Sequence, residues 1–364
     1  MISFHDVHKV YADGTIAVDR LNLEVPKGTL TVFVGPSGCG KTTSMRMINR
    51  MVEPTSGTVV VDGADIAGVD PVRLRLGIGY VIQGAGLMPH QRVIDNVATV
   101  PVLKGQSRRA ARKAAYAVLE RVGLDAKLAD RYPAQLSGGE QQRVGVARAL
   151  AADPPILLMD EPFSAVDPIV RVQLQREILR LQAELHKTIV FVTHDVDEAF
   201  RLADRVAVFG RGGSLQQYDE PAHLLSRPAN DFVARMIGAG RGYRWLQFLD
   251  ATQLPIRDIN QVTEAAVDEA RLRDGWALII KPDGSPLGWI DASGMRKYRD
   301  GAPLRDSVTS VGALFRRDAT LSHALDAALS SPAAVGVAVD EAGKVIGGVQ
   351  AGDVLAVLDS HRRG

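Results

Sequence analysis

The chain has 364 residues, which favours two domains over one, and 46% of them are hydrophobic, which excludes a disordered or fibrous protein. Its formal net charge is +1, so no overall field marks it as a nucleic-acid binder, and we expect no nucleic-acid partner. The single cysteine, Cys39, excludes an intrachain disulfide and fits a reducing compartment. No apolar run approaches the roughly 20 residues that cross a bilayer, and the first residues lack the layout of a signal peptide. We therefore expect a cytosolic protein that reaches a membrane only through a partner.

Residues 1–237 alternate short apolar runs with amphipathic stretches, which is typical of an α/β domain. Buried strands are predicted at 30–34, 156–159 and 189–193. Near residues 238–242 the sequence becomes rich in glycine, which indicates a boundary. The predicted organisation is an α/β domain at 1–237, a linker at 238–250 and a smaller α+β domain at 251–364.

A glycine-rich stretch follows the first predicted strand: Gly-Pro-Ser-Gly-Cys-Gly-Lys-Thr at residues 35–42, with a helix predicted at 43–50. Strand, loop and helix in this order are the context of a phosphate-binding loop, or P-loop. Its glycines let successive backbone N–H groups point at phosphate oxygens, and the helix N-terminus adds positive partial charge. Lys41 would neutralise the β- and γ-phosphates of a nucleotide, and the Thr42 hydroxyl would ligate Mg²⁺. A helix N-terminus also lowers the pKa of a cysteine, which makes Cys39 a candidate reactive thiol, although we assign it no catalytic role.

A second predicted anion site begins a helix further along the chain. Residues 136–143 read Leu-Ser-Gly-Gly-Glu-Gln-Gln-Arg. Ser137 and the backbone of Gly138 and Gly139 start the helix, so they could hold a γ-phosphate by hydrogen bonds and by the helix dipole.

Two adjacent acids end the predicted strand at 156–159. A buried strand that ends in Asp160 and Glu161 places a carboxylate beside a nucleotide bound at the P-loop. Asp160 would hold Mg²⁺, directly or through water, and Glu161 could polarise the attacking water as a general base. The pattern predicts nucleotide hydrolysis.

Together these motifs resemble those of the ABC ATPases. In that family a signature motif lies between the P-loop and the two acids, and residues 136–143 match it residue for residue in the same place. The resemblance covers roughly the first 240 residues. It implies a mixed-sheet core with a helical subdomain, and ATP and Mg²⁺ as cofactors. It also implies a head-to-tail dimer, in which the signature motif of one copy faces the nucleotide held by the other.

Four further residues match motifs of the same family. Gln83, in Tyr-Val-Ile-Gln, corresponds to the Q-loop glutamine, which senses Mg²⁺ or water and couples to the permease. Asp167 ends Ser-Ala-Val-Asp, which resembles the D-loop with valine where leucine is usual. His194 ends a predicted strand and corresponds to the switch histidine that contacts the γ-phosphate. Tyr11 lies where the family stacks an aromatic ring on adenine; a tyrosine that only packs against its neighbours is the alternative.

The motifs and the resemblance together define the expected site residues. Nucleotide binding is expected from Tyr11, Gly35, Ser37, Gly38, Cys39, Gly40, Lys41, Thr42, Thr43, Ser137, Gly138, Gly139 and Asp167; Mg²⁺ binding from Thr42, Gln83 and Asp160; and hydrolysis from Glu161, His194 and Gln83.

The C-terminal part contains an internal repeat. Residues 262–295 align with 321–354 at a constant offset of 59 without a gap. Alanine or glycine recurs at four matched positions, among them Gly284 and Gly343, and the apolar positions match as well. Each copy reads as helix, strand, tight turn, strand and helix start, which predicts a duplicated βαβ-like unit.

Two features resemble the importers of glycine betaine, carnitine and choline within the ABC family. Residues 79–90 and 93–97 are similar to the Q-loop region of their ATPases, and the repeat resembles the paired cystathionine-β-synthase (CBS) domains that follow those ATPases. The resemblance implies ATP-driven uptake of osmoprotectants such as glycine betaine, choline, carnitine or proline. The CBS pair would regulate uptake in response to ionic strength or a nucleotide. Adenosine-binding CBS repeats carry a hydroxyl residue and an acid near the second strand. Of these two groups, the second copy keeps only the acid, Asp353. This argues against adenosine binding of that kind.

The resemblance also implies partners: a second copy of the chain, transmembrane permease subunits and, indirectly, an extracytoplasmic substrate-binding protein. The chain would lie peripherally at the cytoplasmic face of the cell membrane, with residues 84–97 coupling it to the permease. Alternatives are transport of another small solute or export, a soluble ABC ATPase outside transport, and a CBS pair that serves only dimerisation. The basic residues at 104–113 are predicted to form a solvated helix face.

Overall fold

The computed structural model describes residues 1–164 and 166–363, and it divides the chain into two compact units, Met1–Gly238 and Ala239–Gly364. The division falls in the glycine-rich stretch at 238–242. Among the described residues, no helix has the length and apolar character needed to cross a membrane.

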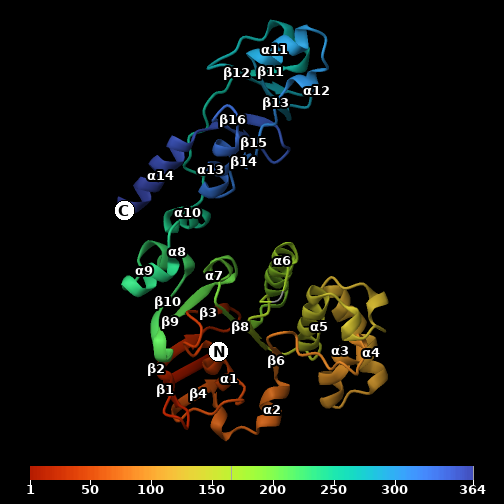
Figure 1. Ribbon diagram of the computed structural model, residues 1–364, viewed down its shortest axis with the longest axis vertical. Helices are drawn as coiled ribbons and strands as arrows, with labels where there is room; N and C mark the ends of the chain where they lie inside the picture. Colours follow the sequence, from red (N-terminus) through yellow and green to blue (C-terminus); the bar gives the residue numbers. More distant parts are fainter. Residues whose placement is uncertain (165, 364) are drawn as a thin grey trace. The chain divides into compact units, whose positions relative to one another are not determined.

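The first sheet of the N-terminal unit has four antiparallel strands in the order β2-β1-β4-β5 (Figure 1). In β2 the alternate residues Leu21, Leu23 and Val25 are buried, which is the pattern of a sheet with one face on a core. Tyr11 lies in the turn that joins β1 to β2. The strands are β1 (Ile2–Val10), β2 (Ile16–Val25), β4 (Ser56–Val61) and β5 (Ala64–Asp65).

The second sheet has six strands in the order β10-β9-β3-β8-β7-β6, and β10 alone runs antiparallel to its neighbour. The strands are β3 (Leu30–Val34), β6 (Ile78–Val81), β7 (Ile156–Asp160), β8 (Thr188–Thr193), β9 (Arg205–Phe209) and β10 (Leu215–Asp219). Every residue of β3, β7 and β8 is buried, which suits parallel strands covered on both faces and confirms the three predicted strands. Because the carboxyl ends of parallel strands meet at one edge, the loops after β3, β6, β7 and β8 begin close together.

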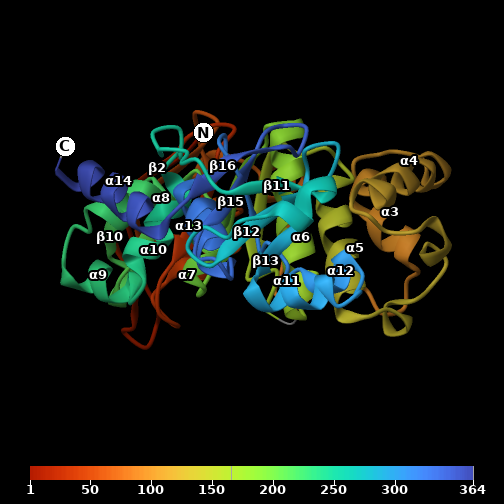
Figure 2. The same ribbon diagram turned by 90° about the horizontal axis from the view of Figure 1, so that it is seen from above.

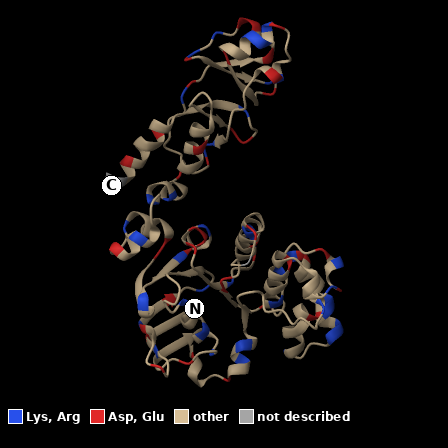
Figure 3. Cartoon of the chain, in the orientation of Figure 1, with Lys and Arg blue, Asp and Glu red and all other residues tan. Residues whose placement is uncertain are grey.

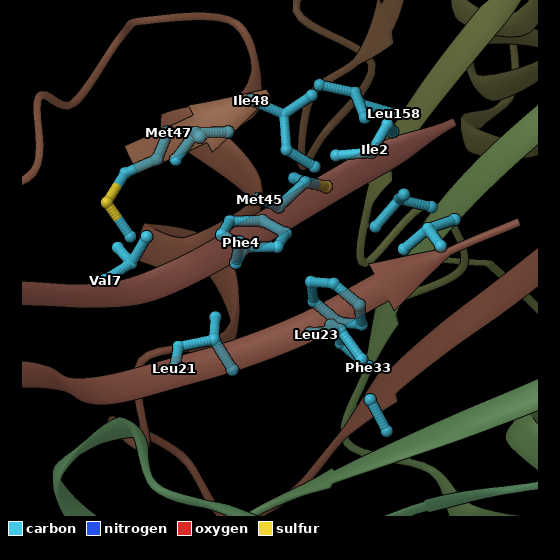
Figure 4. Close-up of a cluster of buried hydrophobic side chains, with 14 of the residues drawn as sticks. Ile2, Phe4, Val7, Leu21, Leu23, Phe33, Met45, Met47, Ile48 and Leu158 are labelled. Carbon is cyan, nitrogen blue, oxygen red and sulfur yellow. The ribbon is translucent and has the colours of Figure 1, made fainter. Parts of the chain in front are cut away.

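One hydrophobic core lies between these sheets and helix α1 (Lys41–Ile48), as Figure 4 shows. Phe4 from β1, Phe33 from β3 and Met45 from α1 meet in it and are fully buried. The rings of Phe33 and Phe209 have their centroids 5.0 Å apart. Burial of each such side chain stabilises the fold by about 1.5–3 kcal/mol, so the strand and the helix that flank the P-loop are both firmly anchored.

Three helices pack on one another beside the sheets, as both views show (Figures 1 and 2). They are α3 (Val93–Leu103), α4 (Arg108–Arg121) and α5 (Gly138–Leu150). The basic stretch predicted as a solvated face begins at the end of α3, and lysine and arginine gather along α4 (Figure 3). One of them is also structural, because Arg112 forms a bidentate ion pair with Asp95 of α3 at 2.7 and 2.8 Å.

The remaining helical elements of this unit are short, apart from α6. The α-helices are α2 (Pro71–Leu76), α6 (Pro168–Leu185), α7 (Val196–Leu202), α8 (Pro221–Ser226) and α9 (Asp231–Ile237), and the 3₁₀ turns are η1 (Ile66–Gly68), η2 (Ala126–Leu128), η3 (Pro133–Gln135) and η4 (Arg211–Gly213).

The C-terminal unit contains two three-stranded sheets of the same design, β11-β12-β13 and β14-β15-β16. In each, a parallel pair is followed by an antiparallel hairpin. Leu278 pairs with Trp289 in the first hairpin, and Val337 pairs with Gly348 in the second, so both partners are related by the offset of 59. The elements are β11 (Gln261–Thr263), β12 (Trp276–Ile280), β13 (Pro286–Asp291), α11 (Ala292–Arg299), α12 (Leu304–Ser307), β14 (Leu314–Arg316), α13 (Leu321–Ser330), β15 (Gly336–Val339), β16 (Val345–Val349) and α14 (Ala351–Arg363).

One element differs between the two copies. The second copy has the predicted helix before its hairpin, α13, but the first has only a 3₁₀ segment, η6 (Glu264–Glu269). Ala327 and Ala328 are buried on α13, and the matching positions of the first copy hold Asp268 and Glu269. Acidic side chains cannot replace buried alanines in that packing, so the prediction of a helix there was wrong.

The segment predicted as a linker at 238–250 is folded. It contains α10 (Arg241–Trp245) and the 3₁₀ turn η5 (Leu246–Phe248). Leu246 is buried in a hydrophobic core with Phe315 and Val354, so these residues belong to the C-terminal unit. The linker prediction rested on glycines alone, and it overlooked the apolar residues that follow them.

Candidate functional site

The glycine-rich loop at 35–40 leaves the carboxyl end of β3 and enters α1 in a backbone conformation that only glycine adopts without strain. Gly40 has φ of 90°, and a Cβ there would lie 2.0 Å from the carbonyl oxygen of Ala17. A Cβ at Gly35 would lie 2.4 Å from the carbonyl oxygen of Phe209. Pro36, Ser37 and Gly38 form the exposed part of the loop. The loop is therefore held close to two other strands while its middle stays accessible.

Lys41 and Cys39 are both buried beneath this loop, and the Lys41 ammonium lies 3.7 Å from the Cys39 sulfur. The Lys41 ammonium is buried and donates hydrogen bonds to the carbonyl oxygens of Gly35 and Pro36, at 2.8 and 2.9 Å. Its charge therefore lies under the loop, beside the backbone expected to hold phosphate. The Cys39 side chain is part of the hydrophobic core, and burial raises the pKa of its thiol. Desolvation outweighs the opposing effect of the nearby Lys41 charge, which argues against a reactive thiol at Cys39, and its buried side chain leaves the backbone as the group that can approach a nucleotide.

Asp160, at the end of β7, is bound by three side chains from other elements. The Thr42 hydroxyl donates to one carboxylate oxygen at 2.8 Å. The other oxygen accepts from the Arg46 guanidinium at 3.3 Å and from the Tyr80 hydroxyl at 3.4 Å. The hydrogen bond from Arg46 to Tyr80 raises the pKa of the guanidinium, and burial raises the pKa of the phenol.

Sequence reasoning did not identify Arg46 or Tyr80. Arg46 lies four residues after Thr42 on α1, so the two share a helix face, and this spacing could have revealed the arginine. Tyr80 lies on β6, and no local pattern in the sequence places it at Asp160.

The three residues expected to act in hydrolysis lie together at the ends of three neighbouring strands. Gln83 follows β6 and donates from its amide nitrogen to a Glu161 carboxylate oxygen at 3.2 Å. His194 follows β8, with Nδ1 3.3 Å from the other oxygen of Glu161. Glu161 itself follows β7 and has φ of 43°, which turns its side chain out of the strand direction. A carboxylate held between an amide and an imidazole is suited to accept a proton from water.

Tyr11 stands at the other side of the P-loop. Its hydroxyl lies 3.4 Å from the Thr43 hydroxyl, and the Lys9 ammonium lies 5.4 Å from the centre of its ring. The side chain is 43% exposed, so part of the ring is open to a planar base.

The signature motif forms a separate cluster. Ser137 caps α5, and its backbone N–H and hydroxyl both donate to Glu140 at 2.8 Å. The hydrogen bond from the Ser137 backbone lowers the pKa of the Glu140 carboxyl. Gly138 and Gly139 form the first turn. Among the described residues, no hydrogen bond or ion pair joins these three to the P-loop.

Asp167 caps α6 and accepts a hydrogen bond from the backbone of Ile169 at 2.9 Å. Ala165, in the same motif, lies outside the described residues. Like the signature cluster, Asp167 forms no hydrogen bond to the P-loop among the described residues. The signature residues and Asp167 are thus separate from the P-loop, whereas Ser164, at the start of the D-loop motif, donates from its hydroxyl to the carbonyl oxygen of Glu161 at 3.0 Å.

This fold and this site define a P-loop ATPase of the ABC class. A family model described as "ABC transporter" matches residues 18–164. The choline transport ATP-binding protein OpuBA of Bacillus subtilis is 49% identical over 332 residues, which are 87% of each chain. The glycine betaine/carnitine/choline transport ATP-binding protein OpuCA of the same species is 50% identical over 87% of this chain and 84% of that protein. A dimeric ATP-binding cassette in a post-hydrolysis state, bound to ADP and Pi, is 32% identical with a TM-score of 0.56 and matches 61% of this chain and 99% of that one.

The similarity to these relatives extends well beyond the family-model match. The chain belongs to the ABC transporter family, as an ATP-binding subunit that couples ATP hydrolysis to transport.

Proposed function

We propose that this chain powers the import of osmoprotectants such as glycine betaine, choline, carnitine or proline, bound to a permease at the cytoplasmic face of the cell membrane. The supporting observation is that relatives named for these solutes align with both units and not only with the ATPase. The glycine betaine/proline betaine transport system ATP-binding protein ProV of Escherichia coli is 36% identical over 95% of this chain and 88% of that protein. The carnitine transport ATP-binding protein OpuCA of Listeria monocytogenes is 50% identical over 80% of this chain and 75% of that protein.

The geometry of the P-loop supports the proposed ATP site. Backbone N–H groups of residues 35–43 and the Lys41 ammonium bind the phosphates, and the open face of the Tyr11 ring stacks on adenine. Thr42, Gln83 and Asp160 offer hydroxyl, amide and carboxylate oxygens, which are the hard ligands that Mg²⁺ prefers. The bound ion would neutralise charge on the β- and γ-phosphates.

Hydrolysis is proposed to use the cluster at the strand ends. Glu161 accepts the proton of the attacking water, Gln83 holds the carboxylate in place, and the His194 imidazole contacts the γ-phosphate. Ser137, Gly138 and Gly139 of a second copy complete the site, as does its Asp167. This arrangement would explain why, in the part of the chain that the structure describes, the signature and D-loop residues form no hydrogen bonds to the P-loop of their own chain.

The proposed permease contact is a cavity of about 340 Å³ between β6, α3 and the end of α5. Leu76, Ile78 and Met88 give it apolar walls, and the Q-loop forms one side. Arg148 of α5 donates to the carbonyl oxygens of Ala85 and Gly86, at 2.9 and 2.7 Å, and so fixes the Q-loop beside the cavity. A permease segment seated here would push directly on the residues between Gln83 and α3.

We propose that the C-terminal unit is a CBS pair that regulates transport. The two copies, each with a parallel strand pair, a hairpin in the same register and a following helix, support this assignment. Asp353, the one ligand-type acid that the repeats retain, forms a bidentate ion pair with Arg257 at 2.5 and 2.7 Å. Its carboxylate is therefore engaged within the fold, which agrees with a regulatory role that does not use adenosine binding of the usual kind.

Reconstitution in liposomes tests the proposal. The full chain is combined with the permease and substrate-binding protein of a quaternary-amine importer, and uptake of labelled glycine betaine, choline, carnitine and proline is measured against amino acids and sugars. ATP-dependent uptake of an osmoprotectant, absent in Lys41→Ala, supports the proposal. Uptake of another solute class, or hydrolysis that never responds to the permease, would overturn it in favour of a different cargo or of a soluble ATPase.

A further inference from the structure

Glu198 is a buried acid of the ATPase unit that the hydrolysis scheme does not use. It lies on α7, is 7% exposed, and burial raises the pKa of its carboxyl. One carboxylate oxygen accepts a hydrogen bond from the Thr193 hydroxyl at 2.7 Å, and the other accepts from the Gln175 amide at 3.4 Å. The carboxylate therefore joins the end of β8 to the middle of α6.

The contact with Thr193 fixes the turn that carries the switch histidine. The Thr193 hydroxyl also accepts the backbone N–H of Asp195 at 3.0 Å, and the Asp195 carboxylate accepts the backbone N–H of Glu198 at 3.2 Å. The residues on both sides of His194 are thus tied to the start of α7. The imidazole itself is more than half exposed and contacts only Glu161 among the described polar groups. Its direction is therefore set by the backbone of the turn rather than by packing around the ring.

The contact with α6 connects this turn to the D-loop. Arg171, on the first turn of α6, donates to the carbonyl oxygen of Val166 at 3.4 Å. The same guanidinium lies 3.8 Å from the carboxylates of both Asp195 and Glu198. A shift of the D-loop would therefore be transmitted through α6 to the group that holds Thr193.

Glu161, His194 and Glu198 line one small cavity of about 50 Å³. It has room for a few water molecules at most, at about 10–15 Å³ of accessible space each. Glu198 therefore lies next to the hydrolysis cluster without sharing a hydrogen bond with it.

We propose that Glu198 is a positioning residue: it holds the Thr193 hydroxyl and thereby directs the His194 imidazole toward the γ-phosphate. It does so only while α6 and the D-loop before it are in place. The proposal rests on the proposed role of His194. On this proposal, the D-loop influences the orientation of His194 in its own chain, and the D-loop is expected to face a second copy in the dimer. A small misplacement of a catalytic group lowers a rate by up to about 10²-fold. Loss of the contact between Glu198 and Thr193 should therefore lower kcat and leave nucleotide binding unchanged.

The test removes one hydroxyl from the full chain. Thr193→Val keeps the side-chain shape but cannot donate to Glu198, and Thr193→Ser keeps the donor. In Thr193→Val we expect kcat for ATP hydrolysis to fall at least about tenfold, with KM for ATP changed less than about twofold. In Thr193→Ser we expect kcat to stay within about threefold of the unmodified chain. Thr188→Val is the matched control, because it removes a buried hydroxyl at the other end of the same strand, where Thr188 accepts from the backbone of Gly28 at 3.0 Å.

The His194→Ala background separates positioning from a general loss of structure. If Thr193 acts through the histidine, Thr193→Val lowers kcat no further in His194→Ala. Additive losses, an equal loss in Thr188→Val, or a KM that rises with kcat unchanged would each overturn the positioning role. If His194→Ala alone leaves kcat unchanged, the proposed role of the histidine fails first. If His194→Ala abolishes hydrolysis while Thr193→Val is neutral, only the present inference fails.

Discussion

Replacing Glu161 by glutamine changes the basicity of the proposed general base while keeping its shape. The glutamine oxygen can still accept from Gln83, now 3.2 Å from the carboxylate. Neither Lys41 nor Thr42 forms a hydrogen bond to Glu161, and Gln83 keeps an acceptor in the glutamine oxygen, so the groups expected to bind phosphate and Mg²⁺ stay in place. The variant therefore isolates proton transfer from nucleotide binding.

General-base catalysis contributes about 10²–10⁴-fold, and at about 1.4 kcal/mol per decade this is a barrier increase of roughly 3–5 kcal/mol. We expect Glu161→Gln to lower kcat by that factor, with ATP affinity changed less than about twofold. Because a second copy is proposed to complete the ATP site, and hydrolysis is proposed to release it, we expect the variant to accumulate as an ATP-bound dimer.

Phosphate release gives kcat, and light scattering with ATP gives the mass in solution. Glu184→Gln is the control, since Glu184 lies on the exposed side of α6 and pairs only with Arg180 among the described residues. Turnover within threefold of the unmodified chain would refute the assignment of the base. Loss of ATP binding together with turnover would show instead that Glu161 has a structural role in the site.

Three further predictions concern stability and reactivity. Gly40→Ala should abolish ATP binding, because the added Cβ would lie 2.0 Å from a backbone oxygen of β2. The control is Gly63→Ala, at a position with φ of 84° and no atom within 4 Å of an added Cβ. It should lower the free energy of unfolding in urea by only about 1–2 kcal/mol and leave ATP binding intact. Cys39 should resist thiol reagents in the folded chain and react on unfolding, because burial raises its pKa; prompt labelling of the folded chain would contradict its burial. Asp353→Asn should destabilise the C-terminal unit by about 1 kcal/mol, measured by fluorescence of the tryptophans, all of which lie there. The hydrogen bond from Arg257 holds the pKa of the Asp353 carboxyl in the folded chain below its usual range. The ion pair therefore contributes its full stabilisation above about pH 4, and this contribution is lost as the pH falls through the pKa of the folded state. The same pH dependence of stability in Asp353→Asn would contradict this.

The parts of the site that follow one another along the chain could be predicted from sequence. Leu30–Val34 is an unbroken apolar run followed at once by the glycine loop, and the structure places a fully buried strand there. Asp160 and Glu161 end a strand of the same kind. In these cases a few adjacent residues determine both the local fold and the direction of the next side chain.

What the sequence did not reveal depends on contacts between distant segments. Tyr80 and Asp160 are 80 residues apart and meet because β6 and β7 are neighbours in the sheet. Glu198 looks like an ordinary residue of a helix first turn until β8 and α6 are packed around it. Periodicity reports which face of an element is buried, but it does not report which other element covers that face.

Helix α5 begins at the signature serine and ends where Arg148 holds the Q-loop. Its 13 residues span about 20 Å, and each residue turns the helix by about 100°. Inserting or deleting one residue between Gly139 and Arg148 would therefore rotate one end against the other by more than a quarter of a turn. Evolution can change the composition of this helix, but its length is fixed by the two sites at its ends, so related chains should differ here by substitution and not by insertion.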